Sequence, residues 1–248
     1  MRLFYKAWRE SRGRFLLAAA AILAACLLFL FRARVAFPLA ENPNVPYSAV
    51  GWSTFYGNTA PVVFSMIALV LSLGGLRRES AAGSAGFTLA LPVGRVQMLG
   101  VRAVMGLAEL AALTLIPIVT IPALSPVIAH QSYPVVQSIR FSILFMGWGA
   151  VWFGIGFLWS VLFAGEFTAV AASLLTPVAY IVIYAKVSGD GRRFPVANPF
   201  AFMSGHELFT NGTSTLTGPL PWMGLAVLVG VACALLVAAT WISVRQSF

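Results

Sequence analysis

The chain has 248 residues, of which 60% are hydrophobic and only 9% are charged, and its mean hydropathy is +0.89. Soluble domains carry about 25% charged residues, so this composition excludes an ordinary soluble domain and indicates a chain that lies in a bilayer. The apolar stretches use most of the residues and leave no room for a separate soluble catalytic domain. We therefore expect one membrane domain over residues 1–248.

The formal net charge of +9 first suggests nucleic acid as a partner. Basic residues that flank apolar spans, however, set membrane topology and contact anionic lipid headgroups. Because no basic face interleaved with aromatic residues is present, we expect no nucleic-acid partner. Cys26 and Cys233 lie in apolar runs and belong to no metal-binding motif.

The first 14 residues, "MRLFYKAWRESRGR", predict a helix in the membrane interface. Apolar and small residues recur at spacings of three and four, while Arg2, Lys6 and Arg9 fall on the other side. Trp8 suits the headgroup level, and the arginines suit anionic lipid. The same residues also serve as a topology signal, with or without a mechanical role.

Six apolar stretches follow, each near the length of about 20 residues that a membrane span needs. They cover residues 15–31, 57–76, 101–121, 139–163, 167–187 and 222–244. An even number of spans puts both termini on one side of the membrane. With the termini inside, the cytoplasmic side has most of the 16 basic residues, and we expect both termini there. The cytoplasmic set is Arg2, Lys6, Arg9, Arg12, Arg14, Arg77, Arg78, Arg95, Arg102 and Arg245.

Glycines in the fourth span predict close helix packing. Gly147 and Gly154 are seven residues apart and share one face, and Gly149 and Gly156 share another. Small residues let neighbouring membrane helices approach closely. The segment "NPFAFMSGHELF", before the sixth span, has an apolar pattern too short to cross the membrane. We expect part of it to dip into the outer interface.

The sequence lacks the groups that a membrane enzyme or an ATPase needs. The two histidines, His130 and His206, lie in predicted external loops, and no HExxH helix is present. The phosphate-binding pattern GxxxxGK followed by Ser or Thr is also missing, so we expect ATP hydrolysis on a separate subunit. Glu109 is the clearest acid inside a span; it either bridges helices through a hydrogen bond or lines a substrate path.

The segment after the second span, "RRESAAGSAGFTLALPVGRVQMLGVRAV", differs from the rest of the chain. Its small residues allow close backbone approach, Phe87 offers an apolar anchor, and Arg77, Arg78 and Glu79 offer charge pairing. Pro92 ends a helix, and Arg95 can hold the return at the headgroup level. A loop that only sets topology needs no such pattern, so we favour a contact surface for a partner.

The order of these features resembles the permease subunit of an ABC transporter of the ABC-2 exporter type. The motif-specific part is an acid at Glu79, small residues at Gly83 and Ser84, a leucine-rich stretch, Pro92-Val93-Gly94-Arg95 and the basic Arg102. The resemblance implies an all-α membrane protein with six transmembrane helices, an N-terminal interfacial connecting helix, a cytoplasmic coupling helix and a re-entrant outer segment before the sixth span.

The same resemblance implies function and partners. The coupling residues that contact the ATPase subunit would be Glu79, Ser80, Gly83, Ser84, Phe87 and Thr88, with Pro92, Arg95 and Arg102 at the return to the membrane. The partners would be two ATPase subunits, which hold ATP and Mg²⁺, a second permease copy, identical or related, and membrane lipids. The expected location is the inner membrane of a prokaryote. The alternatives are an ion-coupled carrier or small channel that uses Glu109, and a scaffold that transports nothing.

Overall fold

The computed structural model describes residues 2–36, 47–73, 94–163, 166–188, 197–205, 208 and 218–245. Within these ranges all regular elements are helical. Five helical stretches are long and apolar enough to cross a membrane, which confirms an all-α chain with the long apolar helices of a multi-pass membrane protein. They are Leu3–Val35, Tyr47–Ser72, Val96–Ile128, Val135–Leu162 and Trp222–Arg245.

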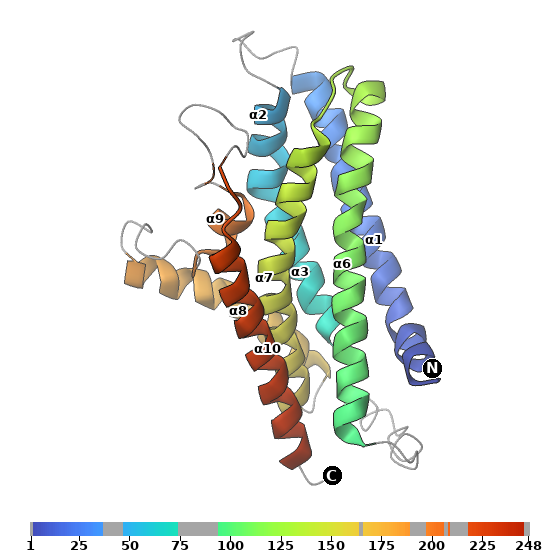
Figure 1. The fold of residues 1–248 in the computed structure, drawn as a ribbon, viewed down its shortest axis with the longest axis vertical. Helices are drawn as coiled ribbons and strands as arrows, with labels where there is room; N and C mark the ends of the chain where they lie inside the picture. The colour runs from blue at the N-terminus through green and yellow to red at the C-terminus, as the bar shows by residue number, and fades with distance from the viewer. Residues whose placement is uncertain are drawn as a thin grey trace.

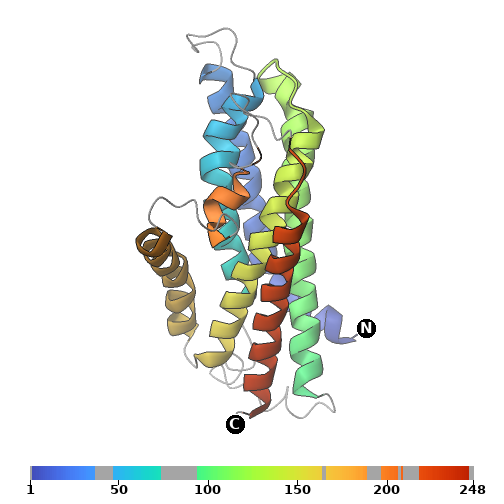
Figure 2. The same ribbon diagram turned by 60° about the vertical axis from the view of Figure 1, so that its left-hand side comes forward.

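The long helices lie side by side in one bundle (Figures 1 and 2). In chain order the elements are α1 (Arg2–Ala36), α2 (Tyr47–Gly51), the π-helix η1 (Trp52–Thr59), α3 (Ala60–Ser72), α6 (Arg95–Ile128), α7 (Val135–Leu162), α8 (Glu166–Ser188), α9 (Pro199–Met203) and α10 (Trp222–Arg245). Helix α1 begins and α10 ends at the same end of the bundle, drawn at the bottom of Figure 1. We call this the lower end.

Helix α7 lies at the centre of the bundle and packs against α3, α6 and α10. Its glycines explain how the neighbouring helices come so close. A Cβ atom on Gly147 or Gly154 would meet Leu225 or Leu235 of α10 at 2.8 and 3.1 Å. A Cβ atom on the other pair of glycines would meet side chains of α3. The prediction that these glycines form two packing faces is therefore confirmed.

The second membrane helix begins earlier than the predicted residue 57, because α2 and η1 continue α3 backwards to Tyr47. This stretch is less apolar than a lipid-facing helix, but its aromatic rings are buried in protein. The Tyr56 ring stacks on Phe141 with centroids 4.1 Å apart, and its hydroxyl donates to Ser138 Oγ at 3.0 Å. Packing, and not hydropathy, therefore places the start of this helix.

The bounds of other predicted spans also change. The predicted interfacial helix (1–14) and first span (15–31) form one continuous helix, α1, with no break in the helical backbone. The third span, predicted at 101–121, belongs to α6, which continues through Pro117, Pro122 and Pro126 to Ile128. The fourth and sixth predictions, 139–163 and 222–244, differ from α7 and α10 by four residues or fewer at each end.

The predicted fifth span, 167–187, coincides with α8. Its apolar stretch, Thr168–Tyr180, is shorter than a full crossing. Helix α8 rises from the lower end and then turns away from the bundle (Figures 1 and 2). Pro177 lies inside this helix, where a missing amide N–H permits a bend. A sixth span stays a prediction.

The outer segment before the sixth span contributes α9, a single short helix that packs against α7 and η1. Asn198 caps it, since its Oδ1 accepts from the Ala201 amide at 3.1 Å. Phe202 and Met203 are buried, and Trp52 Nε1 donates to the Ser204 carbonyl at 2.9 Å. This part of the segment therefore lies against the bundle, while a re-entrant path stays a prediction.

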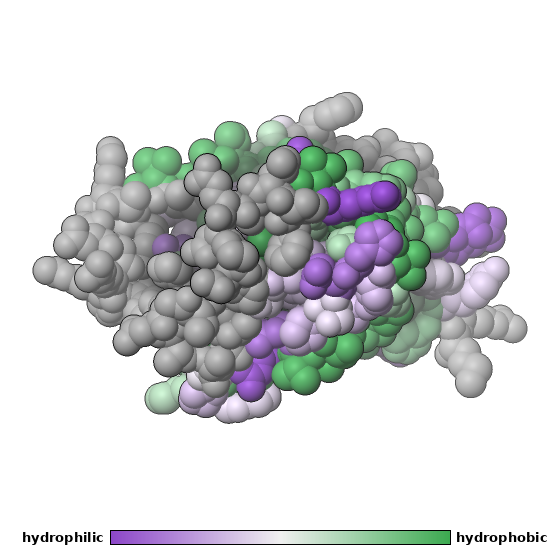
Figure 3. Space-filling view, turned by 90° about the horizontal axis from the view of Figure 1, so that it is seen from above, coloured by the Kyte–Doolittle hydropathy of each residue, from purple (hydrophilic) through white to green (hydrophobic). Residues whose placement is uncertain are grey.

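The flanks of the bundle are apolar. Large apolar side chains on the outer faces of α1, α6 and α10 are exposed, including Met223 and Trp222 on α10. Figure 3, seen from above, shows hydrophobic residues along the flanks and hydrophilic ones among the described residues of the upper end. Such contiguous apolar surface suits contact with lipid chains rather than with water.

Candidate functional site

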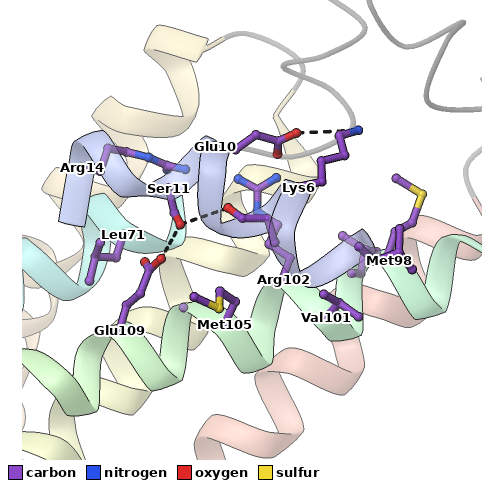
Figure 4. Close-up of a pocket in the computed structure, with 14 residues that line it drawn as sticks. Lys6, Glu10, Ser11, Arg14, Leu71, Met98, Val101, Arg102, Met105 and Glu109 are labelled. Atoms are coloured by element: carbon purple, nitrogen blue, oxygen red, sulfur yellow. Dashed lines mark hydrogen bonds and ion pairs between the residues drawn. The ribbon is translucent and has the colours of Figure 1, made fainter. Parts of the chain in front are cut away.

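A pocket of about 50 Å³ lies near the lower end, between the first four turns of α1, the first four turns of α6 and the last turn of α3 (Figure 4). Its lining is mixed. Apolar side chains form part of the wall, and ionisable or hydroxyl groups form the rest. The polar lining residues are Lys6, Glu10, Ser11, Arg14, Arg102 and Glu109.

Helical spacing brings these residues together. On α6, Met98, Arg102, Met105 and Glu109 follow one another at intervals of three or four and so share one face. The lining residues of α1 have the same spacing, and the two faces meet because α1 and α6 pack along each other. Side chains on a helix lean toward its N-terminus, so the Glu109 side chain leans toward the lower end.

Glu109 is the most deeply buried polar group of this pocket, with 2% of its surface exposed. The Ser11 hydroxyl donates to Glu109 Oε1, which joins α1 to α6. The second carboxylate oxygen, Oε2, is also buried and has no hydrogen-bond partner among the described residues. The positive charges of Arg14 and Arg102 attract the carboxylate. Glu109 therefore bridges two helices and still has one oxygen available to a donor.

The rim of the pocket is more open. Lys6 and Glu10 are one turn apart on α1, and their charged atoms are 3.6 Å apart. Their side chains are 35% and 40% exposed. Exposed pairs of this kind contribute no more than about 0.5 kcal/mol, so this pair does not hold α1 in place. Its effect is to keep both signs of charge at the mouth.

Two arginines close the lower end of α3. Arg14 of α1 donates to the Val70 carbonyl at 3.3 Å, and Arg102 of α6 donates to the Leu73 carbonyl at 3.2 Å. The last carbonyl groups of a helix have no partner within that helix, and cations are favourable there. These bonds attach the end of α3 to both α1 and α6.

The predicted site residues fall into three groups. Glu79, Ser80, Gly83, Ser84, Phe87, Thr88 and Pro92 lie outside the described residues. Arg95 is the first residue of α6. Arg102 and Glu109 lie in the same pocket, although they were predicted to have separate roles.

Sequence reasoning missed Ser11 and Arg14 as partners of this pocket. A signal was present, because Ala7, Ser11 and Arg14 share a helix face with Leu3. Trp8, which was predicted at the headgroup level, is exposed, while Lys6, which was predicted on the opposite side of the helix, lines the pocket. The partner on α6 could not be found from spacing, since 98 residues separate Ser11 from Glu109.

No other chemistry is assembled in the part of the chain that the structure describes. There, no group of three or more His, Cys, Asp or Glu residues could hold a metal ion. His130 is exposed in the turn between α6 and α7, and His206 lies outside the described ranges. Comparison with protein-family models and with curated proteins found no match to this chain.

Proposed function

We propose that this chain is the permease subunit of an ATP-driven exporter of the ABC-2 type. In this proposal the helices form the translocation pathway with a second permease copy, and two separate ATPase subunits supply the energy. ATP and Mg²⁺ bind to those subunits. The segment 77–102 is the coupling element.

The observation that carries the proposal is the attachment of α3 to α1 and α6 at the lower end. Residue 73 follows α3 and residue 94 precedes α6, so the segment 74–93 joins the ends of these two helices. The Arg102–Leu73 bond ties the two ends to each other, and the Arg14–Val70 bond ties them to α1. A coupling element needs such an attachment, because a segment joined loosely to the helices would move without moving them.

The positions of the helix ends also support the proposal. Lys and Arg residues concentrate in the first four turns of α1, the first turns of α6 and the last turn of α10. All three lie at the lower end (Figure 1). Basic residues are enriched on the cytoplasmic side of membrane proteins, so the lower end is the cytoplasmic end in this proposal. An ATPase subunit would then meet segment 77–102 from the cytoplasm.

In the proposed cycle, ATP binding closes the ATPase dimer and moves residues 80–88. The bonds of Arg102 and Arg14 pass this displacement to the lower ends of α3, α6 and α1. These helices then shift against the second permease copy and open the pathway to the outside. The inner membrane of a prokaryote is the proposed location, with α8 as the remaining one of six spans and the outer segment before α10 as a re-entrant element.

The first test is purification of the tagged chain from its native membrane in mild detergent. We expect an ATPase to co-purify with the wild type and to be lost with Phe87→Asp. The matched control is Phe4→Asp, which places the same charge on an exposed phenylalanine outside the segment. Absence of an ATPase from the wild-type preparation, or its retention by Phe87→Asp, would contradict the proposal.

A second variant separates binding from coupling. Arg102→Gln removes the charge that holds Leu73 but leaves residues 77–93 unchanged. We expect the ATPase to stay bound while transport per ATP hydrolysed falls. Arg140→Gln is the control, since Arg140 also donates to a backbone carbonyl, that of Gly218, but toward the opposite end.

The second candidate function is an ion-coupled carrier or channel, which the buried and partly unpaired carboxylate of Glu109 favours. In that case Glu109→Gln abolishes transport and Phe87→Asp is tolerated. The exporter proposal predicts the opposite order of severity. Transport measured for both variants in vesicles therefore decides between the two functions.

A further inference from the structure

We infer that the pocket between α1 and α6 is a binding site for a phospholipid headgroup that carries a primary ammonium group, as phosphatidylethanolamine does. The site needs no ATPase partner. It rests on the depth, the charge order and the size of the pocket.

Helix α1 shows at which level of the membrane the pocket lies. Charged residues at the start of this helix end with Arg14, and an apolar run follows until Arg32. From Arg14 to Arg32 the helix rises by about 27 Å, close to the roughly 30 Å thickness of a hydrocarbon core. Charged side chains are costly in hydrocarbon, so Lys6, Glu10 and Arg14 belong to the headgroup region. The pocket opens where lipid headgroups lie.

The order of charges gives the pocket a direction. The half-exposed Lys6 and Glu10 form the rim, and Figure 4 shows Arg14 and Arg102 on the same side as the rim. Glu109 lies at the buried end. On this side the three cations Lys6, Arg14 and Arg102 outnumber the one acid, Glu10, which suits a phosphate, and the carboxylate at the buried end suits an ammonium group. A headgroup with its phosphate outside and its ammonium inside matches this order.

The buried end of the pocket contains an acceptor that lacks a hydrogen bond. Glu109 Oε2 is buried and has no partner among the described residues. A buried oxygen without a donor is unfavourable, and more so when it is charged. A primary ammonium group brings three N–H donors, whereas a choline headgroup brings none. The Glu109 carboxylate therefore favours an ammonium group over a trimethylammonium group.

The size of the pocket is compatible with this ligand. A water molecule needs about 10–15 Å³ of such space, so a volume of about 50 Å³ holds an ammonium group and the carbon atoms next to it. The phosphate then lies at the rim beside Lys6, Arg14 and Arg102. Leu3, Leu71 and Met98 line the remaining wall, where the apolar part of the lipid can lie.

The test is native mass spectrometry of the purified full chain, titrated with phosphatidylethanolamine, phosphatidylcholine and phosphatidylglycerol of identical acyl chains. We expect phosphatidylethanolamine to bind most tightly, about tenfold more so than phosphatidylcholine, as the gain of one charge-assisted hydrogen bond predicts. Equal binding of these two lipids, or tightest binding of phosphatidylglycerol, would overturn the proposal without any variant.

Variants test which residues cause the preference for phosphatidylethanolamine. Glu109→Gln should lower the affinity for phosphatidylethanolamine about tenfold and leave that for phosphatidylcholine unchanged. Arg140→Gln, the matched control outside the pocket, should keep the wild-type ranking. If Glu109→Gln does not fold, Lys6→Gln at the exposed rim replaces it and should weaken the binding of all three lipids. An unchanged preference in Glu109→Gln, or unchanged affinities in Lys6→Gln, would refute the assignment.

Soluble competitors separate a lipid site from a site for a free anion. We expect phosphoethanolamine to displace bound phosphatidylethanolamine and inorganic phosphate to leave it bound. Displacement by inorganic phosphate alone would mean that the rim cations bind a free anion, and the proposal would fail. Failure of phosphoethanolamine to compete would also count against it, because recognition would then reside in the acyl chains.

Discussion

Gly106 of α6 packs tightly against Phe153 of α7, and replacing this glycine by alanine tests the packing directly. The added Cβ atom would lie 2.5 Å from both Cε2 and Cζ of Phe153. Carbon atoms in good contact are about 3.5–4.0 Å apart, so the ring or the helix must move by about 1 Å. Phe153 is 1% exposed and its ring stacks on Phe157, which leaves little room for the ring to turn.

The magnitude follows from a matched substitution on the same helix. A Cβ atom on Gly100 would meet nothing within 4 Å apart from its chain neighbours and the backbone of its own helix, so Gly100→Ala changes helix propensity alone. That change favours the helix by about 1 kcal/mol. Gly106→Ala gains the same amount but adds an overpacking cost of about 1–3 kcal/mol. The difference between the two variants measures the packing term.

Thermal unfolding in one detergent gives the comparison. For a chain of this size, 1 kcal/mol shifts the Tm by about 2–4 °C, so Gly106→Ala should unfold about 4–8 °C below Gly100→Ala if packing costs about 2 kcal/mol. Phe153→Leu in the Gly106→Ala background should recover part of this loss, because neighbouring sites are not additive. Equal Tm values for the two alanine variants would refute the predicted α6–α7 contact.

Three further predictions concern other parts of the bundle. Ser11→Ala should lower the unfolding free energy by about 1–3 kcal/mol, measured as a Tm decrease, because it leaves the Glu109 carboxylate without its donor; an unchanged Tm would contradict the bond. Burial, and then the nearby Tyr56 and Tyr47, raise the pKa of Tyr133 well above its usual value of 10.0. The neutral Tyr133 hydroxyl therefore gives its full contribution to stability below about pH 10, and this contribution is lost as the pH rises toward the folded-state pKa. Tyr133→Phe should flatten the fall in Tm between about pH 9 and 11. Cys233 is exposed on the apolar surface of α10. We expect it to resist a water-soluble maleimide in lipid vesicles and to react after unfolding in detergent. Labelling in intact vesicles would place α10 outside the bilayer.

The sequence predicted most of the helices because hydropathy and glycine spacing are local signals. The stretch from Trp222 was placed within one residue, since lipid faces much of α10 and its composition is uniformly apolar. The glycine faces of α7 were also predicted, because residues seven apart share a face whatever the fold.

The start of the second membrane helix could not be predicted in the same way. The residues from Tyr47 to Tyr56 are aromatic, small or hydroxyl-bearing, and a hydropathy window reads such a stretch as a loop. They are helical because Phe29, Tyr133 and Phe141 pack around them. These contacts come from three other parts of the chain, and no local pattern encodes them.

The sequence indicated some of the residues of the polar pocket but not their common site. Glu109 and Arg102 stand out as charges at the start of an apolar helix, and both were singled out. Their common site depends on α1 lying along α6, which brings Ser11 to Glu109. Because helix pairing is a property of the folded bundle, spacing within either helix could not reveal it.

The glycine faces of α7 have a mechanical consequence. With α3 seated on one face and α10 on the other, α7 cannot rotate about its axis without driving side chains into both neighbours. These three helices therefore move as one body. Helix α1 lies outside this group and packs mainly on α6, α3 and η1. A movement of α1 along these three helices would have to break both the Ser11–Glu109 bond and the Arg14–Val70 bond, so these two bonds hold α1 in its register on the bundle.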